Sequence, residues 1–146
     1  MKKRFGTVVV GCIAAGMLVV TAAGCAASSS RGQLEVVEAA VRDAPAGLDE
    51  VRVDEGKDGL SRYVLLHLIA SGDELPAESV AATLQEVGDV LPESYNYVHV
   101  AASTASGDRL DVDTVLESLG FSQTYLVNPR MAHIPASALK SFADER

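Results

Sequence analysis

The sequence predicts a small α+β domain in which helices pack on a mixed β-sheet of about four strands. Segments with apolar residues at helical spacing alternate with short segments rich in β-branched and aromatic residues. Gly, Pro and Asp residues separate these segments and supply turns. In a chain of 146 residues, 122 follow residue 24, which is enough for one domain with its own core.

The first helix is predicted over residues 30–44. Ser30 and Gln33 have the spacing of a capping box, and such a pair marks a helix start. Apolar residues then recur at helical spacing. Pro45 is expected to end the helix at the preceding residue.

A β-hairpin is predicted next. Residues 51–54 alternate between valine and charged side chains, which suits a half-exposed strand, and residues 54–59 read DEGKDG, which is turn chemistry. Residues 62–70 are apolar on both faces. This pattern favours a central strand covered on both sides, or a strand at a packed interface.

The second half of the chain alternates helices and strands. Pro76 and Pro92 bound the clearest helical pattern, and Gly120 is placed to cap a short helix at its C-terminus. The expected elements are a helix over 76–91, a strand over 95–102, an exposed loop over 105–109, a short helix over 110–120, a strand over 121–128 and a terminal helix over 134–146.

The predicted element order is therefore αββαβαβα. A strand–helix–strand unit occurs twice after the hairpin, and each is expected to be a right-handed crossover between parallel neighbours. This alternation resembles ferredoxin-like and related α/β sandwiches, although no motif assigns the domain to one family.

The N-terminal segment has the layout of a secretory signal peptide. Lys2, Lys3 and Arg4 are followed by an uncharged stretch over residues 5–24, and basic start, apolar middle and small-residue end are its three parts. A transmembrane helix needs roughly 20 apolar residues, which this run just reaches. Its end is small and lacks the aromatic residues that anchor a span at the interface.

The junction Ala22-Ala23-Gly24-Cys25 resembles the lipobox of bacterial lipoproteins. The resemblance implies that the Cys25 thiol receives a diacylglycerol group and that cleavage follows Gly24. Ala22 departs from the family, in which Leu is commonest at that position. The resemblance covers residues 1–25, so it predicts a signal peptide over 1–24, a lipidated flexible tether over 25–32 and one α/β domain over 33–146.

Cysteine usage agrees with lipidation. Cys12 would leave with the signal peptide, and Cys25 would then be the one thiol remaining, so the mature domain forms no internal disulfide. The expected location is the extracytoplasmic face of the cell membrane, where the lipid supplies the attachment.

The acidic net charge of the chain limits which classes of partner it can bind. Of 12 basic residues, nine follow residue 24, against 20 acidic residues. Nucleic acid is excluded as a partner, because phosphate contacts need a basic face. An anionic lipid surface would also repel the domain, so the Cys25 lipid is the expected contact with the membrane, and an envelope protein is a further candidate partner.

His67 and His99 are the candidate metal or catalytic residues. Both lie on predicted strands, and neighbouring strands could present them on one face. His133 is expected in a loop and would be a third ligand, since catalytic zinc usually takes three protein ligands. The alternative is that His67 and His99 are hydrogen-bonded sheet residues, and no close-spaced ligand pair favours the metal.

Three further patterns have simpler explanations. Ser137 and Lys140 have Ser-x-x-Lys spacing, but the companion motifs of penicillin-binding enzymes are absent. The DEGKDG segment lacks a calcium ligand at the last loop position, which is Leu65. The Asp108, Asp111 and Asp113 cluster is explained by helix capping and exposure. No cofactor is expected.

The sequence thus favours a lipid-anchored, extracytoplasmic envelope lipoprotein that acts as a non-catalytic accessory or binding module. One alternative is a small hydrolase or metal-dependent enzyme that uses His67 and His99. Another is a structural component of envelope assembly, whose open sheet edge accepts a partner strand.

Overall fold

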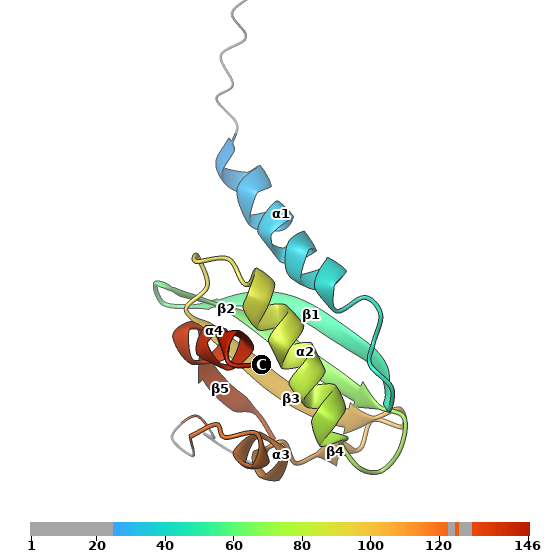
Figure 1. Cartoon of the computed structure of the whole chain (residues 1–146). Helices are drawn as coiled ribbons and strands as arrows, with labels where there is room; N and C mark the ends of the chain where they lie inside the picture. Colours follow the sequence, from blue (N-terminus) through green and yellow to red (C-terminus); the bar gives the residue numbers. More distant parts are fainter. Residues whose placement is uncertain (1–24, 123–124, 126–129) are drawn as a thin grey trace, which may run out of the picture.

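A five-stranded mixed sheet and the helices on one of its faces form two layers (Figure 1). The computed structural model describes residues 25–122, 125 and 130–146. Helices and a small mixed sheet confirm the predicted α+β class, with one strand more than expected.

The predicted hairpin is present, but its turn lies later than expected: residues 54–58 are in the strand, and the turn is at Gly59 and Leu60. Strand β1 (Leu48–Asp58) pairs antiparallel with β2 (Ser61–Ala70). Gly59 lies in the connecting turn at φ +59°, a left-handed conformation that glycine adopts without steric cost. The DEGKDG segment is therefore the end of β1 and its turn.

The first crossover also follows the prediction. Helix α2 (Ala77–Val90) joins β2 to the parallel strand β3 (Tyr97–Thr104). The register runs from Tyr63 beside Tyr97 to Ala70 beside Thr104. Because β2 and β3 are direct neighbours, the sheet differs from the split crossover of ferredoxin-like sandwiches.

The second predicted crossover is wrong. Strand β5 (Ala132–Pro135) pairs with β3 in the antiparallel direction, as does the two-residue strand β4 (Arg109–Leu110) at the other end of β3. Helix α3 (Asp113–Ser118) has six residues, about 9 Å of helix. That is too short to return the chain along β3, whose eight residues span about 26 Å.

The strand predicted over residues 121–128 falls mostly outside the described residues. Phe121, Ser122 and Tyr125, which the structure does describe, are not in a strand. The last strand instead spans the end of the segment expected to be a loop and the first two residues of the predicted terminal helix over 134–146, and it carries His133. Helix α4 (Ala136–Asp144) follows at once, with Pro135 as its N-cap residue.

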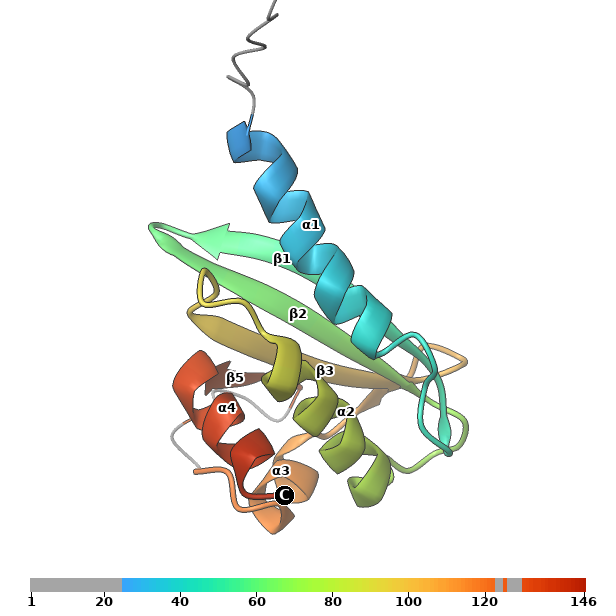
Figure 2. The ribbon, with the colours of Figure 1, turned by 45° about the horizontal axis from the view of Figure 1, so that its top comes forward.

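Helix α1 (Cys25–Ala40) begins earlier than predicted. The residues expected to form a flexible tether, 25–32, are helical, and the N-terminal end of α1 projects away from the sheet (Figure 2). The segment contains Ala and Ser but no Pro, so nothing in it blocks the helix. Gln33 lies inside the helix and does not form the predicted capping box.

Helices α1, α2 and α4 cover one face of the sheet (Figures 1 and 2). Alternate strand residues point into this layer and are fully buried, as in Leu66 and Val100. Gly88 of α2 lets the helix approach α4, because a Cβ atom there would lie 2.8 Å from the Leu139 carbonyl oxygen. We call this side the helix-covered face.

The other side of the sheet carries none of the described helices, and we call it the helix-free face. Residues 62–70 are apolar on both faces, which predicted either a strand covered on both sides or a strand at an interface. In the structure, helices cover this strand on one side (Figures 1 and 2). The central residues of the helix-free face are Tyr63, Leu65, His67 and Ile69 of β2 and Tyr97, His99, Ala101 and Ser103 of β3.

Candidate functional site

The helix-free face is hollowed at the C-terminal ends of β2 and β3. The hollow has a volume of about 570 Å³, within the range of small-molecule sites. Its position follows from side-chain alternation in the strands and from the tight β3–β4 turn. We call it the arginine groove; its lining residues are Arg52, Leu65, His67, Ile69, Ala101, Ala102, Ser103, Thr104, Ala105, Gly107, Arg109, Arg130 and Met131.

The charged residues of the arginine groove all have the same sign. Arg52, Arg109 and Arg130 line it, and none of its described lining residues is Asp or Glu. The chain after residue 24 holds nine basic and 20 acidic residues, so the groove is a local exception to an acidic surface. A cationic hollow in an acidic protein favours an anionic ligand.

The three arginines differ in their surroundings. Arg52 forms two bonds with Glu50, from Nε to Oε1 at 3.0 Å and from Nη2 to Oε2 at 2.9 Å. This pairing raises the pKa of Arg52 and lowers the pKa of Glu50. The Arg109 guanidinium has no hydrogen bond or ion pair within the part of the chain that the structure describes.

The floor of the arginine groove is mainly apolar and contains one hydrogen-bonded polar pair. Leu65, Ile69 and Ala101 supply carbon atoms from neighbouring strands. His67 Nε2 and Ser103 Oγ are hydrogen-bonded at 3.0 Å. A ligand with an apolar body would therefore meet an apolar floor and two groups able to donate or accept a hydrogen bond.

Four rings cross the helix-free face beside the groove. Tyr63 stacks on His99 at 4.3 Å, His99 lies 4.5 Å from His133, and His133 lies 4.2 Å from Tyr97, all between ring centroids. Burial is the main cause that lowers the pKa of His99, and the nearby His133 lowers it further. His99 Nε2 is buried with no hydrogen-bond partner among the described residues, which agrees with a neutral ring.

Gly56 provides space for this ring row. It lies opposite Tyr63 in the hairpin register, and a Cβ atom on it would come within 2.3 Å of the Tyr63 ring. The tyrosine ring thus lies over a residue without a side chain and remains free to stack on His99.

The two histidines of the metal hypothesis lie on one face, as their strands allow, but in different surroundings. His67 is bonded to Ser103, whereas His99 is stacked between Tyr63 and His133. Among the described residues, no group of three or more His, Cys, Asp or Glu side chains has the geometry to hold a metal ion.

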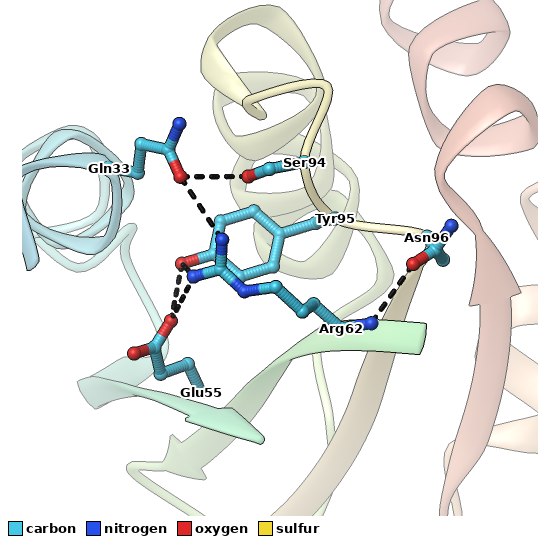
Figure 3. Close-up of polar contacts among 6 residues, drawn as sticks. All are labelled: Gln33, Glu55, Arg62, Ser94, Tyr95 and Asn96. Atoms are coloured by element: carbon cyan, nitrogen blue, oxygen red, sulfur yellow. Dashed lines mark hydrogen bonds and ion pairs between the residues drawn. The ribbon is translucent and has the colours of Figure 1, made fainter. Parts of the chain in front are cut away.

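A second polar cluster lies at the opposite end of β2, near the C-terminal end of α2 and beside α1 (Figure 3). The Arg62 guanidinium donates to Glu55 at 2.8 Å and to Gln33 at 3.3 Å, and it lies 4.7 Å from the centre of the Tyr95 ring. Ser94 also donates to Gln33, at 2.8 Å. The cluster therefore joins α1, the hairpin and the turn before β3, and we call it the Arg62 cluster.

Charges within the Arg62 cluster are satisfied internally. The Tyr95 hydroxyl donates to Glu55 at 2.8 Å. Burial and this carboxylate raise the pKa of Tyr95 to about 12, and hydrogen bonds from Tyr95 and Arg62 lower the pKa of Glu55. Because Arg62, Glu55 and Tyr95 bond to one another, they hold their elements together and leave few free polar atoms for a ligand.

The other predicted sites are scattered. Gly24 lies outside the described residues, and Cys25 is the first residue of α1. Ser137 and Lys140 lie on α4, in the helical layer.

The acidic residues of the predicted cluster have separate local roles. Asp108 accepts a hydrogen bond from Ser106 in the β3–β4 turn. Burial raises the pKa of Asp113, the first residue of α3.

Sequence reasoning missed the arginine groove. Its arginines lie on β1, on β4 and next to β5, so no local spacing connects them. One weak signal was present, because Ala101 and Ser103 are small residues on alternate positions of a strand.

Comparison with known proteins gives no match to a family model, to a curated protein or to a solved structure. Within the described residues, no helix combines the length and apolar character needed to cross a bilayer. The chemistry of the site must therefore be argued from its own residues.

Proposed function

We propose that the protein is a lipid-anchored binding module, held at the extracytoplasmic face of a bacterial membrane by Cys25. The observation that carries the binding role is the arginine groove: a hollow with three arginines and no carboxylate among its described lining residues, on the face without a described helix. The anchor rests on the basic start, the apolar run and the Gly24-Cys25 junction.

The position of α1 supports this arrangement. Helix α1 has 16 residues, or about 24 Å, and the Arg62 cluster fixes its C-terminal part to the hairpin. A lipid on Cys25 would then hold the domain at the end of a short helical stalk.

The anchor is tested by the intact mass of protein extracted from membranes. The expected mass lacks residues 1–24 and includes a diacylglycerol group on Cys25. A Cys25→Ala variant should retain residues 1–24, because the lipidated cysteine directs cleavage in the family that the junction resembles. An unprocessed chain that begins at Met1 in both proteins would contradict the anchor.

A structural role in envelope assembly is the second candidate. Strand β1 pairs with β2 alone among the described strands, so its other edge is unpaired. Most residues of β1 are charged, which is how proteins protect an edge from strand addition. The binding module is therefore the better-supported proposal.

A further inference from the structure

We infer that the arginine groove binds a small monocarboxylate with an apolar body, of the medium-chain fatty-acid type. The carboxylate would bind Arg109 at the rim, and the apolar body would lie on the Leu65, Ile69 and Ala101 floor. This inference names the ligand class of the proposed binding module and rests on that part of the proposed function.

The size of the groove selects a small molecule. A volume of about 570 Å³ matches sites that enclose most of a small ligand. The hollow lies between the β2–β3 surface and the β3–β4 turn, and Met131, at 37% exposure, lines it as well. A flexible thioether side chain adapts to ligands of differing shape.

The charge of the groove selects an anion. Three of the nine basic residues that follow residue 24 line it, whereas none of its described lining residues belongs to the 20 acidic ones. The Arg109 guanidinium has no partner within the described part of the chain. Its planar fork matches a carboxylate, which it can bind through two parallel hydrogen bonds.

The other polar groups favour a single negative charge. Arg52 is already bonded to Glu50, and Arg130 also takes part in an interaction. The remaining polar groups on the floor, His67 and Ser103, are bonded to each other. A dianion would leave charge without a partner, whereas a monocarboxylate is satisfied by Arg109.

The test uses the chain from residue 25 to 146 with Cys25→Ser, which needs no detergent. Its buried apolar residues lie between Val37 and Ala143, so this chain contains the whole described core. Octanoate, octan-1-ol and octylamine are titrated into isotope-labelled protein, and amide shifts are followed. Octanoate is expected to shift the Ala101, Ser103 and Gly107 signals and to bind at least about tenfold more tightly than octan-1-ol. Octylamine should not bind.

Two variants separate the contribution of the carboxylate contact from that of the apolar floor. Arg109→Ala should weaken octanoate binding by about tenfold or more, whereas Arg42→Ala, an exposed arginine on the other side of the core near the end of α1, should leave it unchanged. Ala101→Leu fills the floor and should weaken octanoate and octan-1-ol alike. The amide spectrum without ligand shows that each variant is folded.

Three results would overturn the inference. They are equal affinity for octanoate and octan-1-ol, unchanged affinity in the folded Arg109→Ala variant, and shifts produced by phosphatidylglycerol vesicles but not by free octanoate. Because this chain carries no lipid, such a result leaves the mass measurement on Cys25 as a separate test of the anchor.

Discussion

The two faces of the sheet differ in how far their side chains are buried. On the helix-covered face, alternate residues of β2 and β3 are fully buried by α1, α2 and α4, and Leu66 is 0% exposed. On the helix-free face, the neighbouring residues Leu65 and His67 are half-buried and line a hollow. The same strands therefore supply a core on one side and a surface with unmet apolar and charged groups on the other. The contrast teaches that the helix-covered face holds the core that stabilises the fold, whereas the opposite face carries the proposed ligand site.

The two polar clusters show the same contrast. The Arg62 cluster has an arginine enclosed by a carboxylate, an amide and a tyrosine from three parts of the chain. The arginine groove has guanidinium groups at a rim without lining carboxylates. Arg62, whose bonds are met, joins parts of the fold, whereas Arg109 in the groove has no partner among the described residues and is the arginine that the proposed ligand would bind.

The largest expected effect comes from truncating adjacent leucines on opposite faces. Leu66→Ala should lower the free energy of unfolding by about 2–5 kcal/mol, because it creates a cavity in a fully buried layer. Leu65→Ala should cost less than about 1 kcal/mol, because its side chain is partly solvated. Urea denaturation of both variants measures the difference. Equal losses would mean that the helix-free face is covered in solution.

A second comparison uses two helical glycines. Gly88→Ala should destabilise the protein by about 1–3 kcal/mol, because the added methyl group meets α4 and overpacks the layer. Gly32 has no atom within 4 Å of its Cβ position, so Gly32→Ala should stabilise the protein by up to about 1 kcal/mol. Thermal unfolding measures whether each variant is more or less stable than the unaltered protein. A stabilising effect of Gly88→Ala would contradict the close packing of α2 on α4.

The third comparison removes one hydroxyl from the Arg62 cluster and one from the helix-free face. Tyr95→Phe should lower the free energy of unfolding by about 1–2 kcal/mol, because it deletes the hydrogen bond to the Glu55 carboxylate. Tyr97 lies on the helix-free face, where its ring contacts His133, and Tyr97→Phe should change stability by less than about 0.5 kcal/mol. Chemical denaturation at neutral pH measures both. Equal effects would remove the Arg62 cluster as a stabilising feature.

The smallest effect concerns pH and His99. Its pKa is lowered in the fold, so the unfolded chain binds the proton first as pH falls below the ordinary value of about 6.5. The folded state should therefore lose stability as pH falls from 7.5 toward 5.5, and solvent screening on this half-buried face keeps the loss small. Tyr63, His133 and Asp58 are the groups that act on His99.

A His99→Phe variant tests this assignment, because phenylalanine keeps a ring beside Tyr63 but cannot be protonated. Its urea midpoint should depend less on pH between 7.5 and 5.5 than that of the unaltered protein. The same pH dependence in both proteins would place the titrating group elsewhere.

Local patterns were sufficient for much of the fold. The hairpin around Gly59, helix α2 between Pro76 and Leu91, and the Gly120 cap of α3 all follow from turn and cap chemistry. The Gly120 conformation, φ +90°, with the Phe121 amide bonded to the Leu116 carbonyl, is a helix end of the predicted kind. These features form between residues close in sequence, so sequence alone determines them.

Tertiary structure decided the rest, because it depends on contacts that no local pattern records. The antiparallel direction of β5 follows from the short α3 and from pairing with β3. His99 and His133 meet because β3 and β5 pair antiparallel, although 34 positions separate them. Arg52, Arg109 and Arg130 likewise reach one hollow through strand pairing. The sequence by itself indicated most of the helices and strands, and it predicts lipidation at Cys25. Packing all the described helices on one side determined which face remains open, since each side chain's surroundings depend on partners distant in the chain.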